Sequence, residues 1–95
     1  MKMRTETKIS LELRRFTDLS RNIIEFMTQD AQCGDKNIAL ASYQTSKRYI
    51  SNFEERYMSE GKMEGERLVN YARMISFLRD YSLEKYEEAL RRFGR

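Results

Sequence analysis

Apolar residues recur along this chain at intervals of three and four positions, which aligns side chains on one face of an α-helix. A strand would require an interval of two. The first such segment covers about residues 5–32, and we expect it to form one long amphipathic helix. Its predicted core-facing stripe consists of Ile9, Leu13, Phe16, Leu19, Ile23, Ile24, Met27 and Ala31.

The second apolar segment covers about residues 36–60. Asp35 and Asn37 are the candidate N-caps at its start, and Gly61 follows its end. Alternating steps of four and three are typical of a helix that packs edge-on against a partner helix. The contact would be unusually aromatic, since the stripe consists of Ala39, Tyr43, Ser46, Ile50, Phe53 and Tyr57.

The third segment covers about residues 66–93 and is apolar on more than one side. Leu68, Tyr71, Ala72, Ile75 and Leu78 form one face, while Val69, Met74, Phe77 and Tyr81 add apolar surface around the rest. The stripe resumes at Leu83, five positions after Leu78, and Asp80 and Ser82 are good capping residues at that point. The pattern therefore allows a break near residues 80–82, which would make a fourth helix.

These segments predict an all-α fold, an antiparallel helical bundle of three long helices, with residues 1–95 forming a single domain. The clusters of helix-breaking residues at 33–37 and 59–65 mark the connections, and the chain contains no proline to interrupt the helices themselves. A chain of 95 residues is too short for a second domain of ordinary size.

A helix that is apolar on two sides must be buried on two sides, and a chain this short offers few elements to cover it. The pattern favours a homodimer that docks a protein partner through apolar helix faces. The partner's identity is not encoded in any motif. The candidate interface residues are Tyr43, Ile50, Phe53, Tyr57, Val69, Met74, Phe77 and Tyr81.

The composition argues against an enzyme. The chain has no histidine, the usual acid–base group near neutral pH, and its one cysteine, Cys33, cannot form a zinc site. Glu84, Glu87 and Glu88 share a helix face that could bind a cation. However, Glu87 and Glu88 each precede an arginine, Arg91 and Arg92, by four positions, and this order favours surface ion pairs over a metal site. We expect a non-enzymatic protein without a catalytic residue, cofactor or metal.

The formal net charge is +3, so the distribution of the basic residues matters more than their excess. Residues 36–53 contain no acid, and Lys36, Lys47 and Arg48 form a candidate polyanion-binding strip flanked by Tyr43 and Tyr49. Basic and aromatic side chains together suit single-stranded nucleic acid, which is the alternative function. A solvated helix face explains the same residues more simply.

No apolar run approaches the roughly 20 residues of a transmembrane helix, and the first residues lead into no signal-peptide core. A lone cysteine also cannot build a disulfide framework. We therefore expect a cytoplasmic protein without a membrane segment.

Overall fold

The computed structural model describes the backbone of residues 2–93 and the side chains of residues 11–93, and it confirms an all-α bundle of three long helical rods. The first rod is α1 (Lys2–Glu25), which continues through a π-helical turn, η1 (Phe26–Asp30), into the short α2 (Ala31–Cys33). The second is α3 (Lys36–Phe53), extended by a second π-helical turn, η2 (Glu54–Met58), and the third is α4 (Gly65–Phe93).

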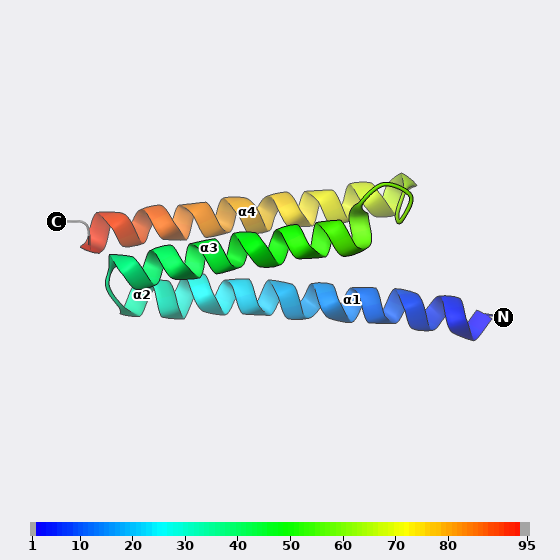
Figure 1. Ribbon diagram of the computed structural model, residues 1–95, viewed down its shortest axis with the longest axis horizontal. Coiled ribbons are helices and arrows are strands. Elements are labelled where there is room, and N and C mark those ends of the chain that lie inside the picture. Colours follow the sequence, from blue (N-terminus) through cyan, green and yellow to red (C-terminus); the bar gives the residue numbers. More distant parts are fainter. Residues whose placement is uncertain (1, 94–95) are drawn as a thin grey trace.

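The three rods lie side by side, and each runs in the direction opposite to the rod before it (Figure 1). α3 is antiparallel to both of its neighbours, and α1 and α4 are therefore parallel to each other. The bundle measures 58 × 20 × 16 Å. Within the described part of the chain, no helix is long and apolar enough to cross a membrane.

Both connections are short and have a clear local cause. Of the two candidate caps, Asp35 is the one that caps α3, because its Oδ1 accepts hydrogen bonds from the backbone N–H groups of Asn37 (2.9 Å) and Ile38 (3.0 Å). The connection from η2 to α4 turns at Gly61 and Gly65, whose φ angles of 84° and 71° lie in the left-handed region that favours glycine.

The helix α4 is continuous from Gly65 to Phe93, so the break considered near residues 80–82 does not occur. The physical reason is that Ser82 takes the core position in that turn. Its side chain is 1% exposed, whereas Leu83 points outward and is exposed. The buried stripe thus continues from Leu78 to Ser82 at a step of four, and the helix keeps its register.

Three aromatic rings, one from each rod, meet in the core. Phe16 on α1 contacts Phe53 on α3 and Tyr71 on α4 edge-on, with ring centroids 5.4 and 5.3 Å apart, and Phe53 lies 5.8 Å from Tyr71. Edge-to-face pairs of this kind add to the stabilisation that burial provides. The aromatic stripe predicted for the second helix is therefore a core contact within one chain.

Half of the buried residues of α3 and α4 are small. They are Ala39, Ser42 and Ser46 on α3 and Ser82 and Ala89 on α4. Between the two helices, the rings of Tyr43 and Tyr86 stack at a centroid distance of 4.6 Å and an angle of 8°. Small buried side chains allow neighbouring backbones to approach, and the stacked tyrosines join α3 to α4.

Two members of the stripe predicted for the first helix lie outside the core. Leu13 and Ile24 are exposed, while Phe16, Leu19, Ile23, Met27 and Ala31 are buried as predicted. Ile23 and Ile24 are adjacent and so point about 100° apart around the helix, and only one of them can face the centre. Ile9 lies outside the residues whose side chains the structure describes.

Candidate functional site

A groove with an apolar lining runs between α1 and α4. It has a volume of about 350 Å³ and is lined by Phe16, Ser20, Ile24, Arg73, Met74, Phe77 and Leu78. We call it the apolar groove. Phe16 and Leu78 belong to the buried core and form its floor, whereas Ile24, Met74 and Phe77 are exposed and form its walls.

Two polar contacts hold the first rod and α4 in a fixed register on either side of this groove. Near the start of α4, Arg67 donates hydrogen bonds to the carboxylate of Glu12 in the middle of α1, 55 positions earlier. Further along, the hydroxyls of Thr28 on η1 and Tyr81 on α4 hydrogen-bond across 53 positions. A nearly constant offset in two parallel helices keeps Ile24 level with Phe77.

Phe77 is the most exposed large hydrophobic side chain in the described part of the chain, at 64%. Ile24 and Met74 beside it are 43% and 39% exposed. The Phe77 ring has one aromatic neighbour on its own helix, Tyr81, at a centroid distance of 6.3 Å. An exposed ring next to an apolar depression is typical of a surface that is covered by another molecule.

The structure divides the eight candidate interface residues into three groups. Ile50 and Phe53 are buried in the core of the single chain, so they are not accessible to a partner. Tyr43, Tyr57 and Tyr81 are partly buried against that core. The remaining three, Val69, Met74 and Phe77, are exposed.

Of the exposed residues, Met74 and Phe77 line the apolar groove, while Val69 does not. Around the helix axis, Val69 points about 140° away from Met74 and about 80° away from Phe77. The sequence interpretation missed Ile24, which it assigned to the core. The adjacent pair Ile23–Ile24 could have revealed this exposed residue. Two neighbouring isoleucines point in different directions around α1, so both cannot face the core.

The candidate polyanion strip does not form one surface. Lys36 and Lys47 are exposed on the side of α3 toward α4, where the Lys47 ammonium lies 4.9 Å from the centroid of the Tyr43 ring. Arg48 follows Lys47 directly and so points about 100° away. It is two positions from each of the buried residues Ser46 and Ile50, a rotation of about 200°, so it lies on the outward side of α3. The three cations are therefore split between two sides of the helix.

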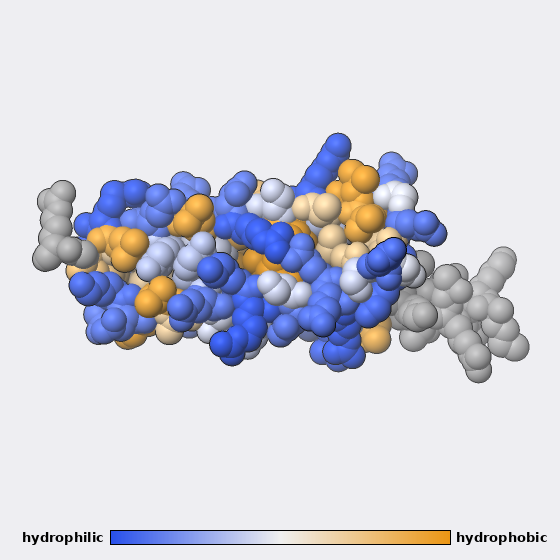
Figure 2. Space-filling view, turned by 45° about the horizontal axis from the view of Figure 1, so that its top comes forward, coloured by the Kyte–Doolittle hydropathy of each residue, from blue (hydrophilic) through white to orange (hydrophobic). Residues whose placement is uncertain are grey.

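The outer face that includes α3 and α4 shows no continuous apolar surface. In Figure 2 its hydrophobic side chains form small groups separated by hydrophilic ones. Lys85 and Glu88 form an ion pair there at 3.2 Å, using one of the three glutamates that share a face. Within the described residues, no group of three acidic or cysteine side chains is arranged to hold a metal ion.

The fold defines the class of the protein as a small all-α, three-helix bundle. In comparisons with known proteins, no family model, no curated protein and no solved structure matches the chain. Its function has to be argued from the grooves and exposed side chains described above.

Proposed function

We propose that this protein is a non-enzymatic helical interaction module that docks a protein helix face in the apolar groove, and that the partner is a second copy of the same chain. The observation that carries the proposal is the exposure of Phe77 beside the groove formed by Ile24 and Met74. Burying an exposed phenylalanine side chain is worth about 1.5–3 kcal/mol, so a partner that covers it gains a substantial part of its affinity there.

A second copy suits this surface because the protruding ring and the depression lie on the same face. A two-fold interface is self-complementary, so the patch on one copy must fit the identical patch on the other. If the two α4 helices cross antiparallel at Phe77, each phenylalanine meets the groove of the opposite copy. One surface then supplies both the protruding side chain and its receptor.

The charges around Phe77 fit the same arrangement. Arg73 precedes Phe77 by four positions, and Asp80 and Glu84 follow it by three and seven. None of these three forms an ion pair with another described residue. In an antiparallel pairing centred on Phe77, Arg73 of one copy lies within one turn of Asp80 and Glu84 of the other. Such pairs chiefly fix orientation and register.

The face is also large enough. Stable interfaces commonly bury about 800 Å² per partner. The bundle is 58 Å long and 20 Å wide, so pairing along most of one long face reaches that area. A cytoplasmic setting is part of the proposal, because the exposed thiol of Cys33 then stays reduced and association depends on packing alone.

The test is the mass of the protein in solution, by size-exclusion chromatography with light scattering. We expect about twice the 11.5 kDa of one chain. Phe77→Glu places a charge in the centre of the interface and should yield a monomer with unchanged helix content. Leu40→Glu is the matched control, since Leu40 is 39% exposed on α3, which contributes no residue to the lining of the apolar groove, and this variant should leave the dimer intact.

Two results would overturn the proposal. One is a monomeric wild-type protein at concentrations up to about 100 μM, above the range in which specific dimers normally form. The other is a dimer that Phe77→Glu and Leu40→Glu affect equally, because the contact would then lie away from the apolar groove. Circular dichroism on both variants ensures that neither result comes from unfolding.

A further inference from the structure

A second groove, between α1 and α3, differs in chemistry from the first. It has a volume of about 250 Å³ and presents cationic and amide side chains over an apolar floor. We call it the arginine groove. Its lining consists of Arg15, Asp18, Leu19, Asn22, Tyr49, Asn52, Phe53, Arg56 and Tyr57.

We infer that the arginine groove binds a small ligand that carries one anionic group, a phosphate or a carboxylate, on a single flat ring. Arg15 on α1 and Arg56 on η2 come from opposite walls, and neither forms an ion pair with another described residue. Guanidinium groups are planar, permanently charged donors that match the oxygen pairs of carboxylates and phosphates.

The amides of Asn22 and Asn52 add donors from the same two walls. Neither side chain hydrogen-bonds to another described residue, so both are free to contact a ligand. The one carboxylate in the lining is already engaged, since Asp18 Oδ1 accepts a hydrogen bond from Arg21 at 2.6 Å. The groove therefore keeps an excess of positive charge.

The rest of the lining suits a ring. Leu19 and Phe53 are buried and form an apolar floor, and two tyrosines stand at the walls. Tyr49 is positioned by Phe26, with ring centroids 5.8 Å apart, and Tyr57 by Phe53 at 4.9 Å. Arg56 in turn lies over the Tyr57 ring at 5.7 Å, a contact that holds the guanidinium at the groove.

The size of the groove limits the ligand. Pockets for drug-sized molecules usually measure about 300–1,000 Å³, so this groove takes one ring with one anionic substituent rather than a polymer. It also lies on the side of α1 opposite the apolar groove, since Leu19 and Asn22 line one and Ser20 and Ile24 the other. Occupation of one groove leaves the other open.

The experiment compares four probes by calorimetric titration against the full chain: phenyl phosphate, inorganic phosphate, neutral benzyl alcohol and benzoate. If anion and ring are both recognised, phenyl phosphate binds most tightly, by about ten-fold or more over either fragment, because each fragment lacks one set of contacts. Benzoate distinguishes the two anion types: if it matches phenyl phosphate, the site is a carboxylate site as much as a phosphate site.

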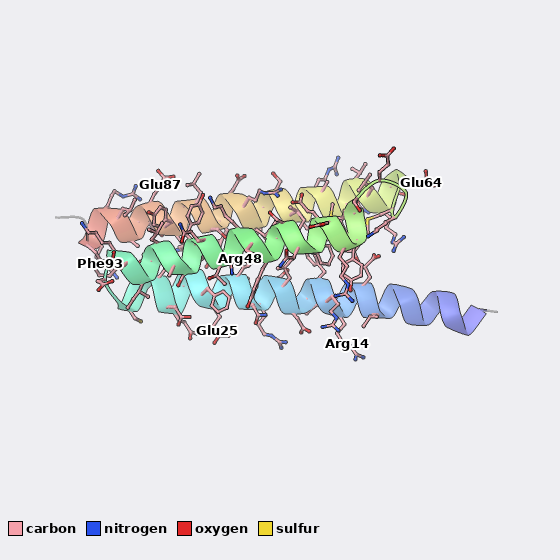
Figure 3. The ribbon with its side chains drawn as sticks, in the orientation of Figure 1. Arg14, Glu25, Arg48, Glu64, Glu87 and Phe93 are labelled. Carbon is pink, nitrogen blue, oxygen red and sulfur yellow. The ribbon has the colours of Figure 1, made fainter. Side chains whose placement is uncertain are left out.

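Arg56→Glu should weaken phenyl phosphate binding about ten-fold or more, since it removes a charge-assisted contact and adds repulsion. Arg14→Glu is the matched control for overall charge, because Arg14 projects from the outer edge of α1, away from the bundle (Figure 3). It should leave binding within about two-fold, as expected of a screened surface charge.

The inference is overturned if phenyl phosphate shows no saturable binding up to about 10 mM, the weak limit of specific recognition. It is equally overturned if Arg14→Glu and Arg56→Glu weaken binding alike, since the effect is then one of net charge. Neither result bears on the dimer, because Phe77→Glu leaves the arginine groove unaltered and should bind phenyl phosphate as the wild type does.

Discussion

Arg67, in the first turn of α4, holds the carboxylate of Glu12 on α1 with two hydrogen bonds. Its Nε donates to Oε2 at 3.1 Å, and its Nη2 donates to Oε1. The pair is asymmetric: the Glu12 side chain is 7% exposed and that of Arg67 is 44% exposed. The carboxylate has thus lost most of its water, and the guanidinium replaces that water as its partner.

Arg67→Met should lower the free energy of unfolding by about 2 kcal/mol, because it leaves a buried carboxylate without its cationic partner. The value is below that for a fully buried pair, since water still reaches the Arg67 side. Glu12→Gln should lower the free energy of unfolding by less than Arg67→Met does. The double variant should lower it by less than the sum of the two single effects. Urea unfolding at neutral pH and one fixed protein concentration measures all three. Strictly additive effects would show that the two side chains do not interact.

Tyr71 makes the stability of the bundle sensitive to alkaline pH. Burial raises the pKa of its phenol above the ordinary value of about 10, and the negative charge of Glu12 acts in the same direction. A raised pKa in the folded state gives stability that is complete below about pH 10 and is lost as the pH rises through the folded-state pKa.

The corresponding variant is Tyr71→Phe, which should make the decline in melting temperature above about pH 10 shallower than in the wild type. Tyr49→Phe is the control, because Tyr49 is exposed and no comparable burial acts on its phenol. Equal slopes for the two variants would mean that Tyr71 does not contribute to the alkaline loss of stability.

The hydroxyls of Ser46 and Ser82 are buried and have no hydrogen-bond partner among the described residues. Burying an unpaired hydroxyl costs free energy, so Ser46→Ala and Ser82→Ala should each stabilise the fold by about 1 kcal/mol. The exposed Ser76 on α4 provides the control for the higher helix propensity of alanine. Thermal unfolding that shows no gain beyond that of Ser76→Ala would indicate that both hydroxyls are satisfied in solution.

Asp35 caps α3 with one carboxylate oxygen that accepts from two backbone donors. Asp35→Ala should therefore cost about 1 kcal/mol in the free energy of unfolding, while Asp35→Ser retains most of the stability. Chemical unfolding of the two variants side by side measures the cap. Equal losses from alanine and serine would contradict a capping role.

The sequence predicts the positions of the helices far better than it predicts which side chains are exposed. Helical periodicity, the cap at Asp35 and the breakers around Gly61 place the three rods to within a few residues. The same periodicity misassigns Leu13, Ile24 and Leu83 to the core and overlooks Ser82, because it ranks positions by hydrophobicity alone. A small polar residue can hold a core position where two backbones come close, and a leucine next to it then points outward.

The two grooves lie between rods, and no local pattern encodes them. Arg15 and Arg56 line one groove but are 41 positions apart in the sequence. That separation alone does not indicate that two residues lie near each other. Lys47 and Arg48 are adjacent and yet point to different sides of α3. Sequence proximity therefore suggests one basic strip, whereas the helix rotation and the packing divide it and pair an arginine of α1 with one of η2.

The sequence by itself determined that this protein is helical, where its three rods lie to within a few residues, and that α4 carries more apolar surface than one face needs. These properties follow from backbone propensities and spacing, which act over a few residues. Only the tertiary structure decided which apolar residues stay exposed and which charges converge. Those outcomes depend on the rotation and register of one helix against another, and contacts such as Glu12–Arg67 set them across more than fifty residues.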